Sequence, residues 1–151
     1  MPNPAAGQAY KVVQISTSSP GEILLALYDG LFKFLLVARH ALEADRRAAA
    51  GQAMSRAHAI ISELYTTLDH DQYPELCDNL TSLYEFCMAR MTHANLKRDP
   101  RALDDVMRVL APVREGFQIA VKQAAQDLAA KEATRGGPEL SSGEPPVRAE
   151  R

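Results

Sequence analysis

The sequence predicts an all-α protein, an antiparallel four-helix bundle with a short N-terminal arm and a disordered C-terminal tail. The chain has 151 residues, the size of one ordinary domain with one hydrophobic core. Ala and Leu are abundant and Gly is scarce before residue 136, a composition that favours helix. Apolar residues recur at spacings of three and four in four stretches, and the short links between these stretches favour antiparallel neighbours.

Residues 1–19 are expected to form the arm. Residues 1–9 are small, polar and Pro-containing, and the following Tyr10–Ile15 segment is too short for an independent element. The first helix is expected from Pro20 to about Asp45. Ser19 is a typical N-cap, Pro20 suits the first helical position, and Glu22 is placed to complete a capping box.

This first predicted helix is apolar around much of its circumference, not along one stripe. We therefore expect it to be covered on two sides. Its apolar residues are Ile23, Leu24, Leu27, Tyr28, Leu31, Phe32, Phe34, Leu35, Leu36, Ala38 and Leu42.

The second and third helices are predicted from their apolar spacing. After a link near 48–51, an apolar stripe that ends at Leu68 predicts the second helix, and 69–72 ends it. The third helix is expected to start around Pro74 and to stop before Asp99.

A fourth helix is predicted from the cap-then-proline signal at Asp99 and Pro100 to about Ala133. Pro112 lies inside it and is expected to bend it. The bundle therefore spans 20–133, and the Gly-, Ser- and Pro-rich residues 134–151 are expected to be a disordered tail. The heptad-like stripe of this helix consists of Leu103, Val106, Leu110, Val113, Phe117, Ala120 and Ala124.

Charge and hydropathy exclude several classes of function. The formal net charge is −2 with interspersed signs, so nothing favours binding of a nucleic acid. No stretch is apolar and long enough for a membrane span, and no secretory signal is visible, so we expect a cytoplasmic protein. Cys77 and Cys87 are ten residues apart in one predicted helix, which excludes a disulfide between them and favours small buried thiols.

No catalytic, cofactor or metal motif is present, and we expect neither an enzyme nor a metal protein. None of the four histidines follows a glutamate by three residues, as a di-iron bundle requires. His40 is the candidate for a histidine phosphotransfer module, although Ala41-Leu-Glu43 follows it in place of the usual lysine and glycine. A homodimeric scaffold bundle is a further alternative that the sequence leaves open.

The segment Tyr10-Lys-Val-Val-Gln14-Ile-Ser-Thr17-Ser-Ser19-Pro20 is followed by Glu22-Ile-Leu-Leu-Ala-Leu27-Tyr28-Asp29-Gly30. In order and spacing these residues resemble the entry of the flagellar secretion chaperone (FliS) family. That family reads tyrosine, glutamine-hydrophobic, threonine-alanine-serine-proline, and then leucine-tyrosine-aspartate-glycine. At lower density the resemblance extends to Arg114-Glu115 and covers roughly three quarters of the chain.

The resemblance implies an export chaperone that binds the C-terminal region of flagellin one-to-one, prevents premature polymerisation and keeps flagellin competent for flagellar type III secretion. Flagellin termini are amphipathic helices whose apolar faces are buried only in the filament, so a chaperone could cover them. An export-gate component or a co-chaperone is a further partner that the family suggests, and a homodimer stays open.

Eleven residues are candidates for partner binding. Five lie beside the core stripes of the predicted helices and could line a groove, although each could instead complete the core: Ile60, Tyr65, Tyr84, Met88 and Met91. The other six are motif or arm positions, and the arm could either fold over an empty groove or fix the first helix: Tyr10, Val13, Gln14, Ile15, Tyr28 and Asn95.

Overall fold

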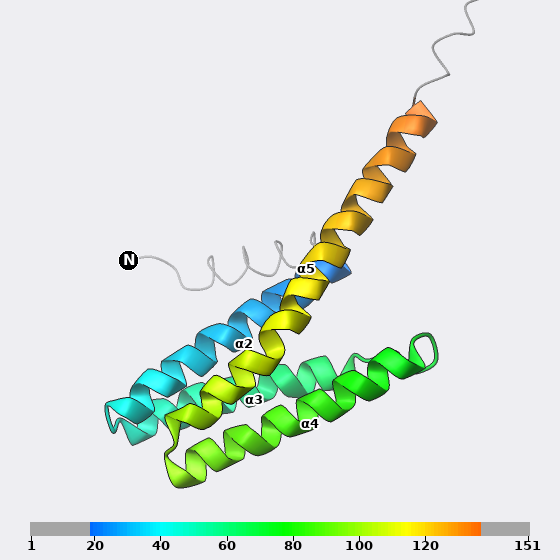
Figure 1. Cartoon of the computed structure of the whole chain (residues 1–151). Coiled ribbons are helices and arrows are strands. Elements are labelled where there is room, and N and C mark those ends of the chain that lie inside the picture. The colour runs from blue at the N-terminus through cyan, green and yellow to red at the C-terminus, as the bar shows by residue number, and fades with distance from the viewer. Residues whose placement is uncertain (1–18, 137–151) are drawn as a thin grey trace, which may run out of the picture.

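The computed structural model describes residues 19–136, and within them the chain is entirely helices and their connections (Figure 1). The all-α prediction is confirmed. The predicted arm and tail lie largely outside the described residues. The four helices are α2 (Pro20–Glu43), α3 (Arg47–Thr66), α4 (Pro74–Lys97) and α5 (Pro100–Gly136).

The helices form a closed four-helix bundle in which each packs against two neighbours. Contacts join α2 to α3, α3 to α4, α4 to α5, and α5 back to α2. Figure 1 shows α3 and α4 lying side by side, with the loop between them at one end of the bundle and the other two connections at the opposite end. The second half of α5 continues beyond the bundle as a projecting helix (Figure 1).

The start of α2 has the predicted capping box. The Glu22 amide donates to Ser19 Oγ at 3.2 Å, and the Ser19 amide donates to Glu22 Oε2 at 3.4 Å. Two backbone donors at the helix start are therefore satisfied by side chains, which fixes the point at which the chain enters the bundle.

The predicted link near 48–51 is wrong, because these residues lie inside α3 and the connection is 44–46. Alanine is the strongest helix former, and a run of three alanines outweighs the single Gly51. The reversal is made instead by Asp45, which has φ 54°. Short acidic and amide side chains tolerate this left-handed conformation better than most, and the sequence pattern did not indicate it.

The ends of α4 agree with the prediction, and α5 is longer than predicted. Arg98, at φ 51°, ends α4 in the left-handed conformation typical of helix C-caps. The last helix continues to Gly136 rather than to Ala133, and it runs through Pro112 without interruption. The predicted bend at Pro112 stays a prediction.

Two tyrosines join α2 to α4 in the centre of the core. Tyr28 and Tyr84 are 0% and 1% exposed, and their hydroxyl oxygens are 2.5 Å apart in a hydrogen bond. Burial, together with this hydrogen bond, raises the pKa of Tyr28 well above its ordinary value, and burial raises the pKa of Tyr84. Each phenol therefore satisfies the other in an apolar environment. The Tyr28 ring also packs against Phe117 of α5, with centroids 5.6 Å apart.

Ion pairs at the rim of the core tie α5 to its neighbours. The Arg39 guanidinium donates to both oxygens of Asp104, at 2.5 Å and 3.0 Å, and this pairing lowers the pKa of Asp104. Arg90 on α4 donates to Asp105 at 2.6 Å. The two parallel hydrogen bonds of the Arg39–Asp104 pair fix the rotation of α2 relative to α5 and its position along the axis.

Both cysteines lie in α4 with free, buried thiols, as the spacing predicted. Burial raises the pKa of Cys87 to about 12. The thiolate is the reactive form of cysteine, so this side chain is an unreactive part of the core at neutral pH.

The tyrosine pair gives a test of the core. We expect Tyr28→Phe or Tyr84→Phe alone to destabilise the fold by about 1–3 kcal/mol, because each leaves one buried hydroxyl without a partner. The double variant should lose clearly less than the sum of the two single losses. Urea denaturation of the four proteins measures this coupling, and additive losses would contradict it.

Candidate partner-binding surface

Three of the predicted partner-binding residues belong to the core of this structure. Tyr28, Tyr84 and Met91 are 0–2% exposed, and their side chains pack inside the bundle. They complete the core, which is one of the two roles that the sequence left open for Tyr84 and Met91. A partner could touch these side chains only if the helices separated.

Four others lie nearer the surface. Ile60 and Met88 are half-buried and pack against the core from its edge. Tyr65 is 37% exposed near the end of α3, and Asn95 is exposed near the end of α4. Tyr65 and Asn95 come from opposite ends of the bundle, so the four side chains do not form one cluster. The remaining four candidates are outside the described residues: Tyr10, Val13, Gln14 and Ile15.

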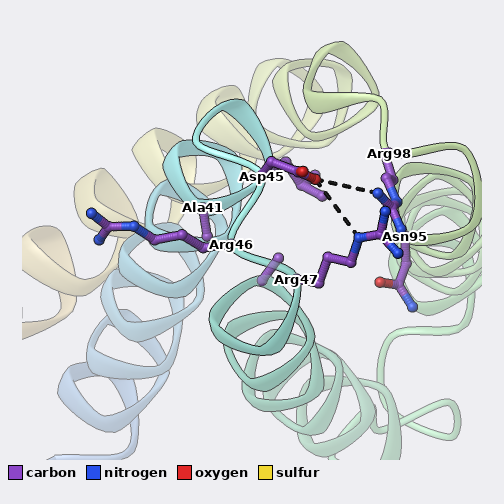
Figure 2. Close-up of a pocket in the computed structure, with 8 residues that line it drawn as sticks. Ala41, Asp45, Arg46, Arg47, Asn95 and Arg98 are labelled. Atoms are coloured by element: carbon purple, nitrogen blue, oxygen red, sulfur yellow. Dashed lines mark hydrogen bonds and ion pairs between the residues drawn. The ribbon is translucent and has the colours of Figure 1, made fainter.

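Asn95 lines a small pocket at the end of the bundle that holds the 44–46 connection (Figure 2). Figure 2 shows Arg47 and Arg98 both directed at Asp45, while Arg46 extends in the opposite direction. The Asp45 carboxylate lies 3.2 Å from Arg98 Nη1 and 3.8 Å from Arg47 Nε. The Asp45 carboxylate therefore pairs with two of the three arginines that line this pocket.

An open apolar groove runs between α4 and α5. Its lining is almost entirely apolar, and Asn79 contributes the main polar side chain. Leu76, which is 48% exposed, lies along it, and the half-buried Phe117 lies at its base against Tyr28. The lining residues are Leu76, Asn79, Leu80, Leu83, Val113, Gly116, Phe117 and Ala120.

A second open groove lies between the start of α2 and the projecting part of α5. Ala120 lines both grooves, so they form one surface along α5. Gly21 lies against Val121 so closely that a Cβ on Gly21 would be 2.7 Å from Val121 Cγ2. The lining residues are Ser19, Pro20, Gly21, Glu22, Ala120, Val121, Ala124, Ala125, Leu128, Ala129 and Glu132.

We call this continuous surface the α5 groove. The heptad-like stripe predicted for the last helix includes Val113, Phe117, Ala120 and Ala124, and the pattern did not indicate a groove. In the structure the stripe is buried only up to Leu110 and becomes exposed beyond Phe117. The length of the stripe could have indicated the groove, because the stripe is longer than the helices that could cover it.

Other kinds of site are not found in the described part of the chain. Residues 19–136 hold no group of three or more His, Cys, Asp or Glu side chains placed to bind a metal ion. No helix described here is both long and apolar enough to cross a membrane. His40 is exposed on α2, with Nδ1 3.8 Å from Glu43.

The contact between Gly21 and Val121 gives a test of the groove wall. Gly21→Ala should gain about 1 kcal/mol of stability from helix propensity when Val121 is also changed to Ala. In the wild-type background the gain should be smaller or negative, because the new methyl group meets Val121. Thermal or urea denaturation compares the two backgrounds, and equal gains would show that α5 does not pack on α2 at this point.

Comparisons with known proteins show the family of the chain and agree with its fold. The family model "Flagellar protein FliS" matches residues 1–124. The chain is 30% identical over 119 residues to the flagellar secretion chaperone FliS of Bacillus subtilis, covering 79% of this chain and 88% of that protein. It is 33% identical to the FliS of Salmonella typhimurium, with 75% and 85% of the two chains covered. It is 34% identical to the flagellar secretion chaperone FliSB of Pseudomonas aeruginosa, with 69% and 82% covered.

A solved structure is similar in fold. The crystal structure of a bacterial flagellar chaperone matches with a TM-score of 0.65 at 21% identity, over 81% of this chain and 99% of that one. The family consists of chaperones and not of enzymes, so the phosphotransfer hypothesis for His40 is set aside. With its family match over most of its length, and relatives above 30% identity, the chain belongs to the FliS family of flagellar secretion chaperones.

Proposed function

We propose that this protein is a cytoplasmic export chaperone that binds the C-terminal region of flagellin one-to-one. While bound, flagellin is kept from polymerising and stays competent for flagellar type III secretion. The observation that carries the proposal is the α5 groove, an apolar surface that the bundle leaves open.

The shape of this groove suits an amphipathic helix. Its walls are helices, its lining is mainly apolar, and its polar side chains, such as Asn79 and Glu22, are exposed. Helices that dock in grooves place apolar residues at i, i+3, i+4 and i+7 against such a lining. A flagellin terminus has this pattern, because its apolar face is otherwise buried only within the filament.

The place of the arm in the sequence supports a role for it at the same surface. Ser19 lines the α5 groove, and the arm residues come before it in the chain. We include Tyr10, Val13, Gln14 and Ile15 in the proposal as residues that cover the empty groove or contact the bound flagellin. Their apolar and amide side chains are of the kind that such a contact requires.

Calorimetry against the C-terminal segment of flagellin tests the function. We expect one-to-one binding with a negative heat-capacity change, because apolar surface is buried as the segment folds onto the groove. Leu76→Glu should weaken the affinity at least tenfold, since a charge would be buried in an apolar wall.

Leu36→Glu is the matched control. Leu36 is 46% exposed, close to the 48% of Leu76, and it lies on α2 outside the α5 groove. Glutamate is a good helix former at either position. The proposal fails if the segment does not bind the wild-type protein, and the assignment to the α5 groove fails if both variants bind equally well. Tyr84 is unsuitable for this test because a charge at its position would unfold the core.

A further inference from the structure

The pocket around Asp45 and a longer cleft between α3 and α4 form one continuous surface. Asn95 lines both of them. The cleft has a volume of about 310 Å³ and extends along α3 as far as His58. Arg47 and His58 are eleven residues apart, which is about 16 Å along the helix, or three helical turns. We call this surface the α3–α4 cleft.

The α3–α4 cleft has an apolar base and an edge that can form hydrogen bonds. Met54 and Met91 are both buried and lie at its base, while Leu96 beside them is 74% exposed. No other large apolar side chain in residues 19–136 is as exposed as Leu96. Methionine adapts its shape to apolar groups that pack against it. The exposed polar side chains of the edge are Ser55, His58, Thr92 and Asn95.

One end of the α3–α4 cleft is positively charged. Arg47 and Arg98 both point towards Asp45 (Figure 2), and within residues 19–136 neither has another carboxylate within 4 Å. Only Arg98 donates a hydrogen bond to Asp45, at 3.2 Å, whereas Arg47 Nε lies 3.8 Å away. Each guanidinium has five N–H donors, so most of them are available to a second carboxylate. Two arginines and one aspartate also leave a net charge of +1 at this end.

The rest of the hairpin is acidic, and this limits the kind of anion that fits. Residues 57–89 contain six Asp or Glu and no Lys or Arg, and they lead to the loop at the opposite end of the bundle (Figure 1). A nucleic acid or an anionic membrane would extend over these carboxylates and be repelled by them. The surface therefore favours a short partner with negative charge at one end and apolar side chains along the rest.

The terminal segments of the chain itself do not supply this partner. Residues 1–18 contain no Asp or Glu. In the segment after α5, Glu150 is the farthest acidic residue, and the 14 residues from Gly136 to it span at most about 50 Å. Gly136 is about 54 Å along α5 from Pro100, which is two residues after Arg98. A separate molecule is therefore required.

We propose that the α3–α4 cleft binds an amphipathic helix of another protein that carries carboxylates in its first turn. The carboxylates pair with Arg47 and Arg98, and apolar side chains at i, i+4 and i+7 contact Leu96 and the methionines at the base. Acidic residues in the first turn also stabilise the partner helix itself. None of the residues that line this cleft belongs to the α5 groove, so the two sites are independent.

Fluorescence anisotropy with a synthetic peptide tests the proposal. The probe is a peptide of about 15 residues with glutamates in its first turn and leucines at i, i+4 and i+7. We expect saturable one-to-one binding to the full chain, and the same peptide with glutamines in place of the glutamates should bind at least tenfold more weakly. Absence of saturable binding up to about 1 mM, or equal affinity for the two peptides, would overturn the proposal.

Removal of the two arginines identifies the charged end. Arg47→Gln with Arg98→Gln should lower the affinity for the glutamate peptide to that for the glutamine peptide. Arg56→Gln with Arg108→Gln is the matched control, because it makes the same change in net charge outside the cleft. Arg56 lies over the Phe34 ring of α2, and Arg108 is on α5. Equal losses in the two variants would show an effect of net charge alone and would contradict the assigned site.

Two variants test the apolar part of the site. Leu96→Gln should weaken both peptides by the same factor, about tenfold, since both lose the same apolar contact. Leu76→Glu changes the α5 groove and should leave peptide binding unchanged to within about twofold. A loss with Leu76→Glu would mean that the peptide occupies the α5 groove, and the proposal would fail. The flagellin measurement with Leu76→Glu is separate, so failure of this site and failure of the proposed function are distinguishable.

Light scattering covers the case of a second copy of the chain as the occupant. If Arg47→Gln with Arg98→Gln changes the oligomeric state but not the affinity for the glutamate peptide, the arginines serve contacts between copies and the proposal is wrong. We expect the opposite result, a loss of peptide binding at an unchanged oligomeric state. Circular dichroism of each variant checks that its helical content is that of the wild-type chain.

Discussion

The structure depends on a mismatch of helix lengths. The helices α2, α3 and α4 have 24, 20 and 24 residues, whereas α5 has 37. At a rise of about 1.5 Å per residue, α5 is about 55 Å long and its neighbours at most about 36 Å. Its apolar stripe therefore continues past the helices that cover it, and a long helix in water is stabilised mainly by packing of its apolar face. The α5 groove is the direct result of this mismatch.

A groove of this kind requires a rigid frame. The Tyr28–Tyr84 hydrogen bond fixes α2 against α4 in the core, and the Arg39–Asp104 pair fixes α2 against α5 at the rim. Directional contacts allow one relative position of the helices, while apolar packing alone tolerates several. The walls of the groove are thus held in place without a partner, and a ligand does not have to assemble its own site before it binds.

The two sides of the bundle have different chemistry. The α5 groove is lined mainly by apolar side chains, and it suits an amphipathic helix from another protein. The cleft between α3 and α4 is more polar, with Ser55, His58 and Thr92 in its lining.

The sequence by itself determined the helix starts at Pro20, Pro74 and Pro100, the all-α class and the family. These depend on local signals, such as the Ser19 and Pro20 start, or on an ordered motif such as Leu27-Tyr28-Asp29-Gly30. The sequence did not determine which apolar residues are covered. Tyr84 and Met91 are buried while Leu76 is exposed, although all three lie in α4 and Leu76 is the most hydrophobic of them. Burial depends on where neighbouring helices end and how they cross, and only the tertiary structure decides that.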